Sequence, residues 1–196
     1  MQLVDSYQRK FSYLRLSVTD RCNFRCVYCL PNGYKKSAEL GDESELSVAE
    51  IKRLVEAFAL MGVTKVRLTG GEPTLRRDIV EIASAAASVP GIEKVALTTN
   101  GYRLAALAPA LRAAGVSAVN ISVDSLDPDE FRKITGTDRF ADVQAGVNSA
   151  IQAGFRSVKV NAVLLKGWND GEVESFIDWI RERPVSVRFI ELMQTG

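Results

Sequence analysis

Hydrophobic and polar residues alternate in six short segments that are rich in β-branched side chains. The segments recur every few tens of residues, and each has the length and the period of a β-strand. The predicted strands are residues 13–19, 65–69, 94–99, 118–123, 157–164 and 186–193.

Helical patterns separate the predicted strands. Residues 48–61 carry apolar side chains at helical spacing, with Ser47 and Glu50 as a capping box before them and Gly62 after them. Further helices are predicted after residues 77, 102 and 140, after an N-terminal cap at Asp127, and over residues 170–183. Alternating strands and helices predict a parallel sheet with right-handed crossovers.

The two faces of the predicted strands differ, and this difference selects the architecture. One face is apolar: Leu14, Leu16, Val66, Leu68, Val95, Leu97, Val119, Ile121, Val158 and Val160. The other is polar: Arg15, Ser17, Thr19, Arg67, Thr69, Thr98, Asn100, Asn120, Ser122, Asp124, Lys159 and Asn161. A doubly wound sheet is covered by helices on both faces and should be apolar on both.

We therefore expect an α/β fold, an incomplete TIM-type barrel of six parallel βα units that forms a single domain over residues 1–196. Its polar face would line a lumen, and unpaired buried cations would require an anionic ligand there. The alternative is that the polar face of each strand faces solvent.

Composition narrows the class of protein. Of the 196 residues, 46% are hydrophobic and 25% charged, which is typical of a globular domain. The 25 basic and 24 acidic residues nearly cancel, so we expect neither a nucleic-acid nor a membrane partner. No apolar run approaches the ~20 residues of a membrane span, and the first ten residues lack a secretory core, so we expect a cytoplasmic protein. The absence of histidine excludes a Ser-His-Asp triad and a histidine-ligated zinc site.

Three cysteines, Cys22, Cys26 and Cys29, follow directly after the first predicted strand, where βα loops build barrel active sites. An odd number crowded into eight positions suits metal ligation better than disulfides. Three thiolates can bind three irons of a 4Fe–4S cube and leave the fourth iron open to an external ligand. The alternatives are three buried structural cysteines or a zinc knuckle that lacks one ligand.

The spacing of the cysteines, with an aromatic residue before the third, resembles the signature of the radical S-adenosylmethionine superfamily. In that family the open iron binds the methionine amino and carboxylate groups, and the reduced cluster cleaves the sulfonium to a 5′-deoxyadenosyl radical. The resemblance implies that Cys22, Cys26 and Cys29 are catalytic and ligate the cluster. Tyr28 matches a cofactor-contacting position, with a core aromatic as the alternative. Residues 70–73, Gly-Gly-Glu-Pro, resemble the element whose backbone receives the methionine amino group.

Six segments in order resemble the GTP 3′,8-cyclase family of molybdenum-cofactor biosynthesis: residues 13–26, 66–78, 97–102, 120–127, 158–161 and 187–193. The resemblance implies S-adenosylmethionine contacts from Tyr28, Gly71, Ser122 and Met193, and GTP contacts from Arg15, Arg67, Thr98 and Lys159. The alternative for each cation is an internal ion pair, for Lys159 with Asp124 or Glu191.

The reaction implied by the resemblance removes the 3′ hydrogen of the GTP ribose and yields 3′,8-cyclo-7,8-dihydro-GTP. It requires an electron donor of the flavodoxin or ferredoxin type. The resemblance is also compatible with a homodimer.

The family's second three-cysteine cluster site and its Gly-Gly tail have no counterpart in these residues. We therefore expect a truncated form that does not ligate the second 4Fe–4S cluster and does not cyclise GTP efficiently alone. The alternatives are a radical enzyme with another substrate, such as a peptide or another nucleotide, and a non-catalytic iron–sulfur or nucleotide-binding module.

Overall fold

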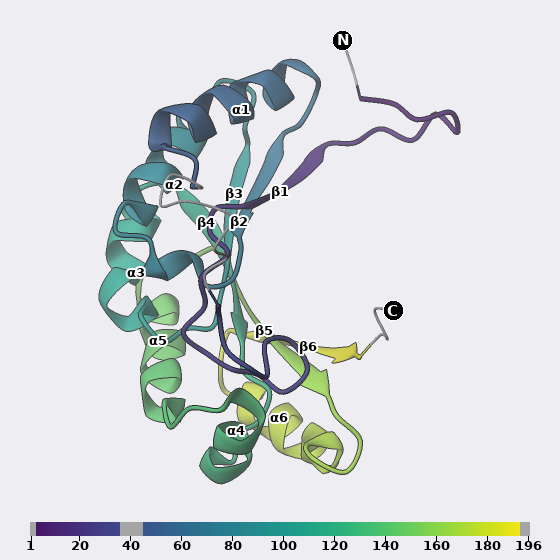
Figure 1. Cartoon of the computed structure of the whole chain (residues 1–196), viewed down its shortest axis with the longest axis vertical. Helices are drawn as coiled ribbons and strands as arrows, with labels where there is room; N and C mark the ends of the chain where they lie inside the picture. The colour runs from purple at the N-terminus through teal and green to yellow at the C-terminus, as the bar shows by residue number, and fades with distance from the viewer. Residues whose placement is uncertain (1–2, 36–44, 193–196) are drawn as a thin grey trace.

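Six parallel strands form one open sheet in the computed structural model, which describes residues 3–35 and 45–192. Their order in the sheet is their order in the chain, so each strand pairs with the next and β1 and β6 are the edges (Figure 1). The strands are β1 (Tyr13–Ser17), β2 (Lys65–Thr69), β3 (Lys94–Thr99), β4 (Val116–Ser122), β5 (Ser157–Leu164) and β6 (Ser186–Glu191). The predicted incomplete barrel of six parallel βα units is confirmed.

The helices cover one face of the sheet. Figure 1 shows α1, α2, α3 and α5 along one side of the strands, with the segment that precedes β1 on the opposite side. The helices are α1 (Val48–Leu60), η1 (Pro73–Leu75), α2 (Ile79–Ala87), α3 (Leu104–Ala113), α4 (Pro128–Thr135), α5 (Phe140–Gln152), η2 (Asp170–Glu172) and α6 (Val173–Ile180). Within the described residues, none of them is long and apolar enough to cross a membrane.

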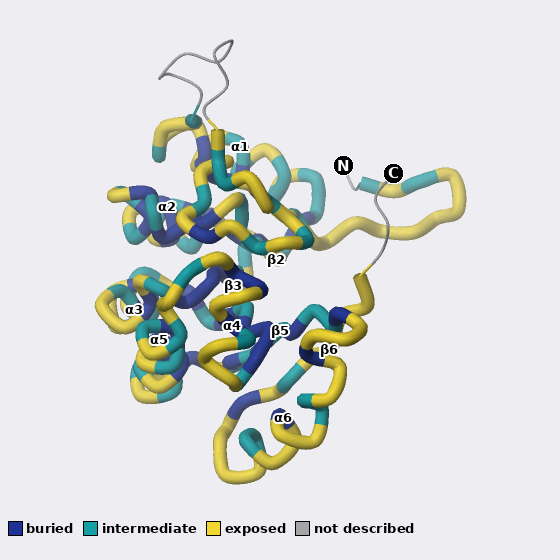
Figure 2. The backbone as a smooth tube through the Cα atoms, turned by 60° about the horizontal axis from the view of Figure 1, so that its bottom comes forward, coloured by how far each residue is buried: buried dark blue, intermediate teal, exposed yellow. Residues whose placement is uncertain are grey.

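The hydrophobic core lies between the apolar face of the sheet and these helices. Nine of the ten predicted apolar strand residues are buried in it, and Leu14 packs against it. Figure 2 shows the buried segments concentrated around β3 and β4, whereas β6 is exposed along almost its whole length. The prediction that one face packs on helices is therefore confirmed, and the polar face is left on the concave side.

Local sequence signals explain several element boundaries. The Ser47 hydroxyl accepts a hydrogen bond from the Glu50 N–H, and the Glu50 carboxylate accepts one of 2.8 Å from the Ser47 N–H. The Asp127 carboxylate accepts hydrogen bonds of 2.9 Å from two N–H groups in the first turn of α4. Several features differ from the predictions. A bulge lets β4 begin at Val116, before the predicted residue 118, and the short helix η1 was not predicted. β1 ends at Ser17, two residues before the predicted end, and the last helix, α6, ends at Ile180 and not at residue 183.

Strand register places the polar side chains in rows across the concave face. Arg15 on β1 lies opposite Arg67 on β2. Further along the sheet, Asn120 on β4 lies opposite Lys159 on β5. Because side chains alternate between the faces of a strand, residues at these positions share one surface.

Candidate functional site

The cysteine loop, residues 18–35, is held against α4 by its own backbone. The N–H groups of Arg25 and Val27 donate hydrogen bonds of 2.9 and 3.0 Å to carbonyl oxygens of the last two residues of α4. The Phe24 side chain is only 4% exposed and meets Phe131 of α4 edge-on, with ring centroids 6.1 Å apart. The loop therefore has a fixed position at the carboxyl ends of the strands.

The three cysteines lie together on this loop. The N–H groups of Cys29 and Leu30 both donate to the Cys26 carbonyl at 3.0 Å, which forms a turn. Cys22 and Cys26 are half-buried and Cys29 is exposed. Burial raises the pKa of the Cys26 thiol to about 12, and the charges of Asp124 and of the other two cysteines add to this effect. Thiols this close to one another and to a carboxylate are ionised by bound metal, which displaces their protons.

The three cysteines have the chemistry of iron–sulfur ligands. They are the only cysteines of the sequence, which has no histidine, and all three are free thiols. A 4Fe–4S cube takes one thiolate per iron. The donor set of three cysteines on one loop therefore fits three corners of a cube.

Two glycines allow the loop after β2 to touch the cysteine loop. The Gly71 N–H donates to the Thr19 carbonyl at 2.8 Å, and the Glu72 N–H donates to the Arg21 carbonyl at 2.7 Å. A Cβ atom would lie 2.2 Å from the Thr19 carbonyl oxygen at Gly70 and 2.3 Å from the Arg21 carbonyl oxygen at Gly71. Both distances exclude a side chain, so the two backbones approach closely only because these residues are glycines.

The Glu72 carboxylate ties this loop to the end of β3. It is 1% exposed and accepts hydrogen bonds from the Thr99 hydroxyl at 2.7 Å and the Asn100 N–H at 2.6 Å. The Thr74 N–H adds a third at 2.9 Å. Burial raises the pKa of Glu72, while these donors favour its ionised form. Sequence reasoning missed this role, and the Gly-Gly-Glu-Pro motif was the only signal for it.

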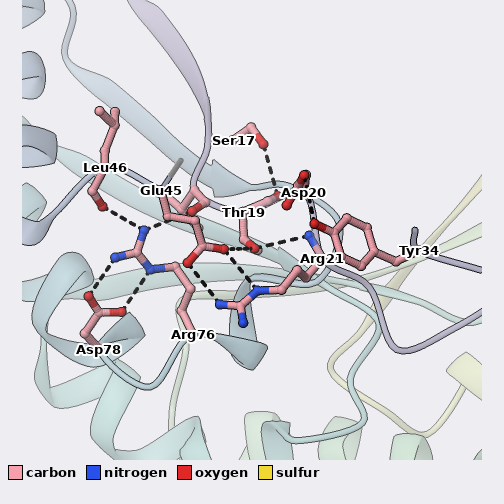
Figure 3. Close-up of polar contacts among 10 residues, drawn as sticks. Ser17, Thr19, Asp20, Arg21, Tyr34, Glu45, Leu46, Arg76 and Asp78 are labelled. Carbon is pink, nitrogen blue, oxygen red and sulfur yellow. Dashed lines mark hydrogen bonds and ion pairs between the residues drawn. The ribbon is translucent and has the colours of Figure 1, made fainter. Parts of the chain in front are cut away.

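A second buried charge, Arg76, joins the same loop to the end of β1. Its guanidinium forms an ion pair of 2.7 Å with Asp78. It also donates hydrogen bonds of 3.0 Å to the Val18 carbonyl and 2.8 Å to the Leu46 carbonyl. Figure 3 shows the contacts of Arg76 with Asp78 and Leu46, with Glu45 beside them. Arg76 is 6% exposed, and its contacts with Val18, Leu46 and Asp78 hold these three chain segments together next to the cysteine loop.

Tyr28 connects the cysteine loop to the other half of the sheet. Its hydroxyl donates a hydrogen bond of 2.7 Å to Asp124, which follows β4 and is 2% exposed. The second Asp124 oxygen accepts a hydrogen bond of 2.9 Å from the Val163 N–H on β5. Burial raises the pKa of both Tyr28 and Asp124.

A polar cavity of about 580 Å³ lies on the concave face, below these loops. Every strand contributes to its lining: Tyr13, Arg15, Arg67, Thr98, Asn120, Asn161, Arg188, Phe189 and Ile190. Within the part of the chain that the structure describes, none of the three arginines forms an ion pair. The polar face therefore lines a cationic cavity, as the strand pattern predicts.

The cavity brings together three of the four predicted GTP contacts, Arg15, Arg67 and Thr98, whereas Lys159 is not part of its lining. Burial lowers the pKa of Lys159, and the charges of Arg188, Lys94 and Arg67 lower it further. No carboxylate of residues 3–35 or 45–192 pairs with Lys159, so the internal ion pair considered for it is not formed.

The predicted cofactor contacts lie at strand ends. Gly71 follows β2, Ser122 ends β4 opposite Asn161, and Tyr28 is on the cysteine loop. Met193 lies outside the described residues. The site prediction omitted Arg188, although its alternation with Ser186 along β6 placed it on the inner face.

Comparisons with known proteins agree with this geometry. The family model described as Radical SAM superfamily matches residues 16–180. A relative named GTP 3′,8-cyclase from Aeromonas hydrophila is 57% identical over 99% of this chain and 57% of its own length. A second, from Edwardsiella ictaluri, has the same name and is 56% identical over the whole chain and 59% of its own length. The chain thus spans less than two thirds of the curated relatives it matches.

Solved structures share the fold. Streptococcus suis SuiB bound to S-adenosylmethionine superposes with a TM-score of 0.76 at 18% identity, over 94% of this chain and 42% of SuiB. The structure of anSMEcpe with bound AdoMet gives 0.72 at 16% identity, over 93% of this chain and 51% of that protein. Because the family model runs from β1 to the end of α6, the chain belongs to the Radical SAM superfamily.

Proposed function

We propose that this chain is the S-adenosylmethionine- and cluster-binding part of a GTP 3′,8-cyclase, which converts GTP to 3′,8-cyclo-7,8-dihydro-GTP in molybdenum-cofactor biosynthesis. The main support is one arrangement: a three-cysteine loop at the strand ends, next to a cavity lined by three arginines that form no ion pair within residues 3–35 and 45–192. The 57% identity to a relative of that name supports GTP as the substrate. The complete reaction is proposed for the whole enzyme, of which this chain spans about 57% in that relative.

Cys22, Cys26 and Cys29 would each bind one iron of a 4Fe–4S cluster. With S-adenosylmethionine bound, the cluster supplies a 5′-deoxyadenosyl radical, so the demanding chemistry belongs to the cofactor. The protein's part is to bind and orient. We assign cofactor contacts to Tyr28, Gly71, Ser122 and Met193, and the hydrogen bond between Tyr28 and Asp124 would keep the tyrosine ring in place.

The substrate would lie in the cationic cavity with its triphosphate near Arg15, Arg67 and Lys159. Guanidinium groups match phosphate oxygens in geometry and stay charged at every physiological pH. Because the cysteine loop lies at the carboxyl ends of the same strands, a nucleotide held by its phosphates would present its ribose toward the cofactor. Thr98 belongs to this set, as an acceptor for the Arg67 guanidinium. We also propose an electron donor of the flavodoxin or ferredoxin type, a homodimer, and a cytoplasmic location.

The cofactor part of the proposal is tested by anaerobic reconstitution. The chain should bind about four irons with matching sulfide, and its visible spectrum should change when S-adenosylmethionine is added. Reduction of the cluster with dithionite should then convert S-adenosylmethionine to 5′-deoxyadenosine. A variant in which all three cysteines are replaced by serine is the control and should hold no cluster. A cluster that is complete but produces no 5′-deoxyadenosine would favour a non-catalytic iron–sulfur module.

The substrate part is tested by GTP binding. Arg67→Ala and Lys159→Ala should each weaken binding at least tenfold, because each removes a charged contact of about 1.5 kcal/mol or more. Lys166→Ala, a change at an exposed lysine after β5, is the matched control and should leave affinity unchanged. If the chain produces 5′-deoxyadenosine but binds no nucleoside triphosphate, it acts on another substrate.

A further inference from the structure

The Arg67 guanidinium is held from both sides by neighbouring strands. Its Nε–H donates a short hydrogen bond to the Tyr13 hydroxyl of β1. Its Nη1 donates a hydrogen bond of 3.1 Å to the Thr98 hydroxyl of β3. The guanidinium carbon also lies 5.9 Å from the centroid of the Tyr13 ring, within range of a cation–π contact.

These contacts leave one edge of the guanidinium available. An arginine has five N–H donors in a rigid planar fork. Among the described residues, Nη2 of Arg67 has no acceptor and no carboxylate pairs with the group. Tyr13 and Thr98 accept hydrogen bonds without neutralising the charge, so the full positive charge remains for a ligand in the cavity.

We infer that Tyr13 is a positioning residue, which orients Arg67 so that its free edge can bind a phosphate oxygen. The inference rests on the proposed function, because it takes the anion in the cavity to be a nucleotide triphosphate. Holding a long side chain in its binding geometry reduces the entropy lost when the ligand binds. Tyr13 lines the same cavity, although sequence analysis gave it no role beyond the start of a strand.

The test is the variant Tyr13→Phe, which keeps the ring and removes the acceptor oxygen. Affinity for GTP and for inorganic tripolyphosphate should each fall about tenfold, as expected for a lost hydrogen bond to a charged group. In an Arg67→Ala background the same substitution should change affinity less than about twofold, because the two residues act as a unit. An equal loss in both backgrounds, or no loss in the first, would overturn the inference.

A second readout does not depend on nucleotide binding. In the nucleotide-free chain, the Arg67 Nε–H should give a slowly exchanging NMR signal, identified by its absence in Arg67→Ala, and this signal should be lost in Tyr13→Phe. Tyr7→Phe is the matched control, because Tyr7 also stacks with an arginine, Arg9, with the guanidinium carbon 5.5 Å from its ring centroid, but it does not line the cavity. An unchanged signal in Tyr13→Phe refutes the positioning role. The expected signal loss in a chain that binds no triphosphate refutes only the proposed substrate.

Discussion

The Tyr28 hydroxyl donates a 2.7 Å hydrogen bond to Asp124, across 96 positions of sequence. The aspartate is in turn bound to the backbone of β5 through Val163, at 2.9 Å. The Tyr28 ring, next to the three cysteines in the chain, is thereby fixed relative to the carboxyl ends of β4 and β5, where Ser122 and Asn161 lie opposite each other.

Asp124→Ala should weaken S-adenosylmethionine binding about tenfold while the iron content stays the same, because it frees the Tyr28 ring without touching a cysteine. The measurement is a titration of the cluster absorption with the cofactor. Asp138→Ala, at an exposed position after α4, serves as the control. Loss of iron in parallel with affinity would show that Asp124 supports the loop and not the ring.

Gly71→Ala should destabilise the chain by about 1–3 kcal/mol and reduce its iron content, because the new Cβ would lie 2.3 Å from the Arg21 carbonyl oxygen. Urea unfolding and iron analysis measure the two effects. Gly171→Ala is the matched control, since a Cβ there meets nothing within 4 Å. Equal behaviour of the two variants would contradict the steric explanation.

Asn161→Leu should raise the free energy of unfolding of the ligand-free chain by about 1 kcal/mol, because Asn161 Oδ1 is a buried oxygen that has no hydrogen-bond partner among the described residues. Urea unfolding measures this change. Asn169→Leu should do the opposite, because its amide forms hydrogen bonds of 2.5, 2.7 and 2.8 Å with the backbone at the ends of β4 and β5. A loss of stability in both variants would show that the unpartnered Asn161 oxygen does not destabilise the chain.

Asp78→Asn should lower the free energy of unfolding by about 2 kcal/mol at pH 7, because it leaves the buried Arg76 guanidinium without its counter-charge. The hydrogen bond and charge of Arg76 hold the pKa of Asp78 below its usual 3.8. The ion pair therefore contributes fully above pH 3.8, and its contribution is lost as the pH falls through the lowered folded-state value. Urea unfolding from pH 7 down to pH 3 should show the gap between the two proteins narrowing below pH 3.8.

The control for this pH dependence is Asp129→Asn, because Asp129 pairs with Arg132 at 3.1 Å but both side chains are more than half exposed. Exposed pairs contribute little, so this variant should follow the unmodified chain throughout the range. A constant difference between Asp78→Asn and the unmodified chain at every pH would rule out the ion pair as its source.

The strands, the helices and the polar inner face were predictable because their signals are local. The alternation along each strand depends only on residues two positions apart. The capping box depends on Ser47 and Glu50, which are three positions apart. The cysteine loop could be predicted equally well, since its three cysteines lie within eight positions. Comparison with known proteins confirmed the superfamily that the cysteine spacing predicts.

The contacts between segments could not be predicted, because they depend on how distant residues meet. Glu72 reads as part of a turn motif, yet its carboxylate is bound by groups 27 and 28 positions away. Arg76 reads as a surface charge, but the fold buries it against the carbonyls of Val18 and Leu46. Arg188 is an exception, because its alternation with Ser186 along β6 was enough to place it on the inner face.

The order of the strands has a mechanical consequence. β1 and β6 pair with one neighbour each and not with each other, so no strand pairing within the described part of the chain sets the distance between them. Arg15 and Arg188 stand on these two strands, and both line the cavity. A triphosphate that contacts both would bridge the opening, so nucleotide binding and the curvature of the sheet would be linked, with each stabilising the other.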